Sequence, residues 1–304
     1  MFSLLISLLL AFLIGWVSQR MGMCLVNASA LLLNRRPTLF VSLVFCGLFG
    51  LLLAPAYGLL GVSQPLFTPQ VAHPLLIGGG LLFGIASVLN DGCSVGTLTK
   101  LACGNINKAF TVVGWVLGIV LWYTLNMLPE HKIILMPSIS SSHYLLTIGV
   151  VLMALLFLVS VHGDKHLVLS SMLLGTLTGA LYTFEPQWTP SVFFYNVSQM
   201  FWMPEQSFIS GRRIAIFVML LVGMCSFTLY RNTFSYQPFD LSKASTHLLS
   251  GILMGIGASM MLGGNDSQIL LVFPTLNLTS TLPIASIAIG IVLSLLLKRR
   301  LARL

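Results

Sequence analysis

The sequence has very few charged residues: Asp, Glu, Lys and Arg make up 7% of its 304 positions, against 57% hydrophobic residues. A soluble domain typically carries about 25% charged residues, so this chain has too few to cover a surface exposed to water. Apolar runs long enough to cross a bilayer recur along the whole length,. The alternating strands typical of membrane barrels are missing. Because backbone groups in lipid need internal partners, the runs predict transmembrane helices surrounded by the lipid bilayer.

Acidic residues are scarcer still, with seven Asp and Glu against fifteen Lys and Arg. The basic residues lie between apolar runs, which is typical of cytoplasmic loops and does not indicate a nucleic-acid partner. If the basic tail at 298–303 is cytoplasmic and the spans number nine, the N-terminus lies outside. Twelve basic residues then fall inside, and only Lys132, Arg212 and Arg213 fall outside.

The predicted fold is an all-α polytopic membrane protein with about nine transmembrane helices and additional short re-entrant helices. Four connections are too long and too apolar for plain loops, namely 19–38, 91–108, 185–209 and 264–282. Backbone that enters the membrane without spanning it is tolerated only where protein or a watery cavity surrounds it. The nine predicted spans cover residues 3–18, 39–60, 75–90, 109–128, 144–162, 167–184, 210–230, 246–263 and 283–298.

Short internal matches indicate a duplication. Residues 80–85 are echoed by 251–256, and 27–29 by 196–198, at a nearly constant offset. The same offset sets Gly92-Cys93 opposite Gly264-Asn265. An odd number of crossings separates the copies, so the pattern predicts two inverted repeats with a site at their interface, as in many transporters. The predicted units are repeat one at 1–128, a connector with the fifth span at 129–166, and repeat two at 167–304.

Cysteine pairs at redox or metal-ligand spacing are absent. The five cysteines are odd in number and form no CxxC, which argues against a disulfide framework or a zinc site,. No GxxxxGK[ST] motif occurs, so the chain does not itself hydrolyse ATP,. Neither a metal nor a cofactor is expected, and the pattern favours a transporter over an enzyme.

Cys93 is the first candidate for contact with a substrate, in the run Gly92-Cys93-Ser94-Val95-Gly96. Glycines on both sides allow a sharp turn or a close helix approach. The free amides at the start of a short helix can hold an anion, and a thiol is a soft hydrogen-bond partner. The alternative is that Cys93 is a small packing residue.

Cys24, Asn27, Asn196 and Asn265 are further candidates. Cys24 follows the first span, one turn after Arg20, which is either a cytoplasmic anchor or an attraction for an anion. Asn27 and Asn196 occupy matching places in the proposed repeats, where an amide either joins helices or lines a pore.

Asp91 and Asp266 lie beside Cys93 and Asn265. Ionisable residues within a membrane are functional candidates, but at the water boundary they need no explanation. A buried Asp91 could carry a coupled proton, although it would also repel an anionic substrate.

Residues 20–24, Arg-Met-Gly-Met-Cys, resemble the R-x-G-[FM]-C element of the YeeE/YedE family, and Gly92-Cys93-Ser94-Val95-Gly96 resembles its G-C-x-x-G element. The resemblance implies an inner-membrane protein of bacteria or archaea that imports sulfur compounds, with thiosulfate the best-described substrate. It further implies an hourglass fold whose cysteines, here Cys24 and Cys93, pass thiosulfate along through S–H···S hydrogen bonds. A small sulfur-carrier protein of the TusA type is the implied partner.

The second half departs from the family pattern. A cysteine is expected after a Gly-Gly pair, but Asn265 follows Gly263-Gly264, and Phe193 stands opposite Cys24. Two other functions are compatible with the sequence: a membrane thiol oxidoreductase, which usually uses CxxC, and a scaffold that recruits a sulfur carrier without transport.

Overall fold

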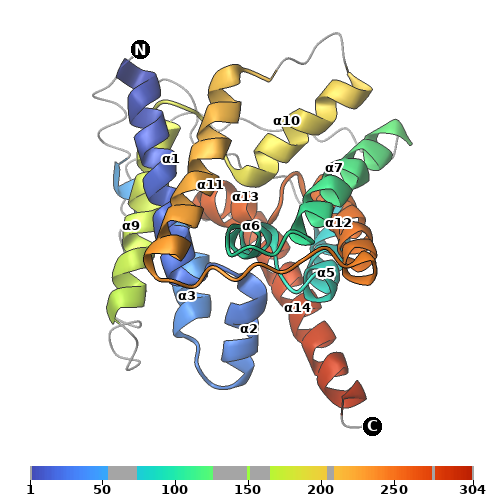
Figure 1. Ribbon diagram of the computed structural model, residues 1–304. Coiled ribbons are helices and arrows are strands. Elements are labelled where there is room, and N and C mark those ends of the chain that lie inside the picture. Colours follow the sequence, from blue (N-terminus) through green and yellow to red (C-terminus); the bar gives the residue numbers. More distant parts are fainter. Residues whose placement is uncertain are drawn as a thin grey trace.

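The computed structural model describes residues 2–53, 74–125, 149–150, 165–203, 209–275 and 278–302 (Figure 1). Every regular element in these ranges is a helix, apart from an isolated bridge between Asn105 and Gln237. The prediction of an all-α fold is therefore confirmed for the part of the chain that the structure describes.

Five helical stretches in the described ranges are long and apolar enough to cross a membrane. They contain α1 (Phe2–Met21), α5 (Pro74–Leu89), α11 (Gly211–Tyr230), α12 (Leu241–Met261) and α14 (Leu278–Leu301). Three further helical segments fall on predicted spans: α3 (Thr38–Phe45) continued by the 3-10 helix η1 (Cys46–Leu53), α7 (Lys108–Thr124) and α9 (Lys165–Tyr182). The span predicted at 144–162 lies outside the described residues except for 149–150, so the count of nine stays a prediction.

Each of the four long connections contains a short helical segment. The first three hold α2 (Leu25–Leu33), α6 (Ser94–Ala102) and α10 (Pro190–Trp202). The fourth holds α13 (Asn265–Ser267), which runs on as the π-helix η2 (Gln268–Val272) and the 3-10 helix η3 (Phe273–Thr275). Each segment starts after a residue in extended conformation, because the chain turns there before it can form helical hydrogen bonds.

Glycines allow the long helices to pack with their backbones close together. Gly114 and Gly118 of α7 face α12, and a Cβ at Gly118 would lie 2.1 Å from the carbonyl oxygen of Ile252. From the other side, a Cβ at Gly255 of α12 would lie 2.2 Å from the carbonyl oxygen of Trp115. Both helices thus carry small residues four positions apart, the spacing that favours close helix association in membranes. The matched runs at 80–85 and 251–256 both contain such packing glycines.

The order of elements is similar in the two halves. From α1 to α7, the order is a long helix, a short helix, two long segments, a short helix and a long helix. The same order recurs from α9 to α14. Figure 1 shows α6 and α13 in the middle of the molecule, with α1, α9 and α11 on one side and α5, α7 and α12 on the other. The short segments α6 and α13 therefore lie inside the bundle, where the site is built.

Candidate functional site

The four short helical segments begin close to one another in the centre of the protein. The residues that precede their first turns are Cys24, Cys93, Thr189 and Gly264. Side-chain contacts link these starting points, as described below, although they are far apart in sequence. We call this region the central junction, and its members are Cys24, Cys93, Ser94, Thr189, Ser191, Gly264, Asn265, Asp266 and Ser267.

Two cysteines form one side of the central junction. The thiols of Cys24 and Cys93 lie side by side next to Gly96, and the backbone N–H of Leu25 donates to the Cys93 Sγ at 3.3 Å. Both side chains are buried. Gly96 leaves room for them, because a Cβ there would lie 2.6 Å from the Cys24 Sγ and 3.5 Å from the Cys93 Sγ. The two predicted cysteines are thus brought into direct contact.

Ser94 and Asn265 connect this side of the junction to the other. The Asn265 Oδ1 accepts hydrogen bonds from the Ser94 backbone N–H at 3.2 Å and from the Ser94 Oγ at 2.6 Å. The Ser94 Oγ also lies 2.9 Å from the Asp266 Oδ1. The predicted residues Ser94 and Asn265 therefore meet at the start of α6 and α13, next to Cys93.

The other side of the junction is built from hydroxyl groups and one carboxylate. The Ser191 N–H donates to the Asp266 Oδ2 at 2.9 Å, and the Gly264 N–H donates to the Ser191 Oγ at 3.1 Å. The Ser267 Oγ lies 2.7 Å from the hydroxyls of both Ser191 and Thr189. All of these side chains are buried, so the hydrogen bonds replace those that water would otherwise make,.

The two aspartates singled out in the sequence differ completely in their surroundings. Asp266 is 0% exposed and forms no ion pair with any described residue. The side chain of Asp91 is 70% exposed and pairs with Lys100, so it lies at the water boundary. Gly92, between Asp91 and Cys93, is buried and accepts a hydrogen bond from the Asn90 Nδ2 at 2.8 Å.

Asn27 and Asn196 are not part of the central junction. Asn27 is exposed as the third residue of α2, whereas Asn196 is the seventh residue of α10 and binds Arg213 and Gln199. The two amides therefore occupy different positions in their helices. The residue that precedes α10, as Cys24 precedes α2, is Thr189 and not Phe193.

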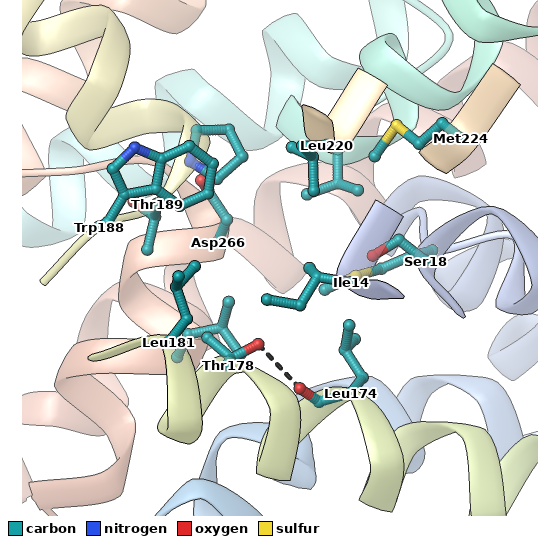
Figure 2. Close-up of a pocket in the computed structure, with 14 residues that line it drawn as sticks. Ile14, Ser18, Leu174, Thr178, Leu181, Trp188, Thr189, Leu220, Met224 and Asp266 are labelled. Carbon is teal, nitrogen blue, oxygen red and sulfur yellow. Dashed lines mark hydrogen bonds between the residues drawn. The ribbon is translucent and has the colours of Figure 1, made fainter. Parts of the chain in front are cut away.

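A small, mainly apolar pocket adjoins the oxygen-rich side of the junction (Figure 2). Thr189, Pro190 and Asp266 contribute to its wall, and Val95 of α6 reaches it from the cysteine side. The remaining wall comes from α1, α9 and α11, and includes Ile14, Leu181 and Leu220. An apolar wall with a few polar groups at one end is typical of a site for a small ligand.

Sequence reasoning missed a buried lysine beside the turn that carries Cys93. Lys108 is 1% exposed; its ammonium donates to the backbone carbonyl of Asn90 and lies 3.5 Å from the His247 Nδ1. Asn90 in turn donates to Gly92 and to the Thr97 Oγ1 at 2.8 Å. This network fixes the turn between α5 and α6. Basic residues between spans usually mark a loop, so the sequence gives no signal that Lys108 is buried.

Arg212 and Arg213, which stand against the predicted charge bias, have an acidic partner. Both arginines pair with Glu185 in the connection between α9 and α10, and the Nε of Arg213 lies 3.6 Å from the Glu185 Oε2. Arg212 also donates to the Ser7 Oγ of α1 at 3.0 Å. Two arginines share one carboxylate, so this end of α11 keeps an excess of positive charge.

Comparison with known proteins identifies a family model described as sulphur transport that matches residues 126–293, more than half of the chain. The matched range includes Thr189, Ser191, Asn265 and Asp266, whereas Cys24 and Cys93 lie before it. No curated protein matches the chain.

Proposed function

Because the chain belongs to the sulphur transport (YeeE/YedE) family, we propose that it imports a small sulfur-containing anion, thiosulfate, along a path through the central junction. Cys24 and Cys93 are the proposed contacts for the terminal sulfur of the anion. Ser94 and Asn265 are the proposed contacts for its oxygens. The N–H of Gly92 already donates to the backbone carbonyl of Ser87 at 2.9 Å and is not among these contacts. No bond of the substrate is made or broken in this mechanism.

One observation carries the proposal: Cys24 and Cys93 touch where short helices begin inside the bundle. Helix N-termini present unpaired N–H groups and a partial positive charge, which favour an anion. A thiol is a weak donor and a polarizable group, which suits the soft sulfur of thiosulfate better than its oxygens. The junction thus offers different partners for the two ends of the anion.

In the proposed mechanism the junction is closed before the anion enters, with the two thiols next to each other and Ser94 bound to Asn265. Passage of an anion exchanges these internal hydrogen bonds for bonds to the substrate. Selectivity then comes from the donors that line the constriction. Asn265 stands where the family has a cysteine, and its amide can donate to an oxyanion where a thiol would meet the sulfur.

The proposed setting is the inner membrane, with the N-terminus outside and the C-terminus cytoplasmic. The two halves, 1–128 and 167–304, are proposed as inverted repeats that meet at the junction. A TusA-type carrier is the proposed recipient of the sulfur compound on the cytoplasmic side, where the basic residues gather.

The experiment is uptake of radiolabelled thiosulfate into liposomes that contain the purified protein. Cys93→Ala and Cys24→Ala should each reduce uptake about 10- to 100-fold, because a hydrogen bond to a charged group is worth about 1.5–3 kcal/mol. Cys225→Ala is the matched control, since this thiol lies on α11 away from the junction. Normal uptake by Cys93→Ala would refute the thiol contact, and a wild-type protein that carries no sulfur anion would refute the function.

A membrane thiol oxidoreductase is the second candidate, and the contact between Cys24 and Cys93 is the observation that favours it. Both thiols are free in the structure. Labelling of thiols in the native membrane, before and after reduction, separates the two functions. An oxidoreductase would cycle through a Cys24–Cys93 disulfide, whereas a transporter keeps both thiols reduced while uptake proceeds.

A further inference from the structure

Asp266 is a carboxylate enclosed in the middle of a membrane protein, and none of the described residues places a cation beside it. It is 0% exposed, and its oxygens accept from the Ser191 N–H and the Ser94 Oγ, each at 2.9 Å. Charged residues within a membrane are costly and usually serve ion or proton pathways. We propose that Asp266 carries a proton together with the sulfur anion, which makes the protein a proton–anion symporter. This inference rests on the proposed function of the junction.

One of the two donors to Asp266, the Ser94 hydroxyl, is also a proposed contact for the substrate anion. The Ser191 N–H belongs to the first turn of α10, and Ser94 begins α6. An ionised Asp266 occupies these donors and repels a second anion at close range. A protonated Asp266 is neutral and accepts hydrogen bonds only weakly, so the donors become available. The anion therefore binds to the protonated form.

Thermodynamic linkage makes this dependence mutual. If protonation of Asp266 strengthens anion binding, then anion binding strengthens protonation by the same factor. Proton and anion enter the junction together on the outer side and leave together on the inner side. The proton binds a carboxylate oxygen and returns to water, so no bond of the substrate changes and no oxidant or reductant is needed.

No other described group beside Asp266 is placed to take over this role. Among the residues that line the adjoining pocket, Asp266 is the only ionisable one that the structure describes. The thiols of Cys93 and Cys24 are the titratable groups across the junction, on the far side of Ser94. The charged and titratable groups of neighbouring elements have their own partners: Lys100 with Asp91, Lys108 with His247 and Asn90, and Glu185 with Arg212 and Arg213.

A small space with a mainly apolar lining lies next to Asp266. In Figure 2, Asp266 lies beside Thr189 and Trp188, with Ile14 and Leu220 across the pocket. The wall is mainly apolar, so a charge on Asp266 gains little from it. In such surroundings, a nearby charge determines whether a carboxyl group keeps or releases its proton.

The test is a proton measurement on the wild-type protein in liposomes that enclose a pH-sensitive dye. Thiosulfate added outside, without any other ion gradient, should acidify the interior at a rate that follows its uptake. In detergent, thiosulfate binding measured in two buffers of different ionisation enthalpy should show uptake of about one proton per anion. Thiosulfate uptake or binding without any proton overturns the inference and leaves the proposed function intact.

The variant Asp266→Asn tests whether Asp266 is the residue that carries the proton. The amide has the same shape but carries no exchangeable charge, so exchange of thiosulfate across the membrane should continue while proton entry stops. Asp91→Asn is the matched control: it removes an exposed aspartate at the end of the same turn as Cys93 and should leave proton entry unchanged. Proton entry that persists in Asp266→Asn overturns the inference.

Asp266→Glu covers the case in which the asparagine variant does not reach the membrane. A glutamate keeps the carboxyl group and should retain proton entry with a shifted pH dependence of uptake. An unchanged pH dependence in this variant would contradict the assignment. A wild-type protein that transports no sulfur anion at all would instead defeat the proposed function, so the two failures are distinguishable.

Discussion

The two sides of the central junction use the same backbone arrangement but different side chains. On one side, α2 and α6 start after Cys24 and Cys93, and the thiols meet. On the other side, α10 and α13 start after Thr189 and Gly264, and hydroxyl groups surround Asp266. Under the proposed mechanism, the helix starts attract an anion on both sides, and the side chains determine whether sulfur or a proton is bound there.

The largest loss of uptake is expected from a substitution that disturbs the cysteine side alone. Gly96→Ala would place a Cβ 2.6 Å from the Cys24 Sγ and 3.0 Å from its Cβ, so the thiol has to move. Displacing a contact group by about 1 Å can cost about 100-fold in rate, and we expect uptake to fall by that order. The measurement is thiosulfate uptake per amount of protein in the membrane.

Gly78→Ala is the control for this substitution. A Cβ at Gly78 of α5 would meet only the flexible end of Met260, at 3.3 Å, so uptake should stay normal. If Gly96→Ala retained full uptake at normal protein levels, close contact of the two thiols would be irrelevant to transport.

Gly264→Ala disturbs the oxygen side in the same manner and should have the next largest effect. The added Cβ would lie 2.8 Å from the Asp266 Oδ1 and 2.9 Å from the Ser191 Cβ. We expect about tenfold slower uptake, because the added methyl group displaces Asp266 and Ser191 from their positions in the junction,. The labelling rate of Cys24 and Cys93 by a small maleimide should not change, in contrast to Gly96→Ala. Altered labelling here would mean that the two sides do not act separately.

Sequence patterns predict structural features that depend on a single segment of the chain. Hydropathy located the long helices, and the length of four connections indicated the short ones, because each signal is local to its segment. Cys24 and Cys93 were paired through their motifs. Asn27 and Asn196 occupy different positions in their helices, because a three-residue match does not fix where a helix begins. Thr189 followed by Pro190, in contrast, has the residue types of a helix start,.

Burial of single charges could not be predicted in this way. Asp91 and Asp266 each follow a span in sequence, yet one is exposed and the other enclosed. The difference arises because Ser94 of α6 and Ser191 of α10, both distant in sequence from Asp266, pack against its carboxylate. Lys108 is enclosed for a similar reason, since its partners Asn90 and His247 come from other elements.

Ser94→Ala removes the side-chain connection between the two sides of the junction and tests whether they act together. It removes the hydroxyl bonds to Asn265 and to Asp266 and keeps the backbone bond to Asn265. The single hydroxyl proton of Ser94 is shared between these two acceptors, so a loss of about 1 kcal/mol predicts roughly fivefold slower uptake. Ser245→Ala on the exposed face of α12 is the control. The ratio of protons to thiosulfate should also drop, because the state of Asp266 is no longer transmitted to the cysteine side.

Cys103→Ala should have the smallest effect on uptake. It tests whether cysteine contacts with the anion are confined to the central junction. The Cys103 Sγ accepts from the Gln19 Nε2 at 3.0 Å and lies 3.8 Å from the Thr228 Oγ1, so its partners belong to α1 and α11 and not to the short helices. Loss of these weak bonds should lower stability by about 0.5–1.5 kcal/mol and leave the uptake rate of folded protein unchanged. Thermal unfolding and uptake, measured on the same preparation, separate the two effects. Slower uptake at unchanged stability would mean that the path of the anion extends past α6 to Cys103, and that contact with sulfur is not confined to the place where the helices begin.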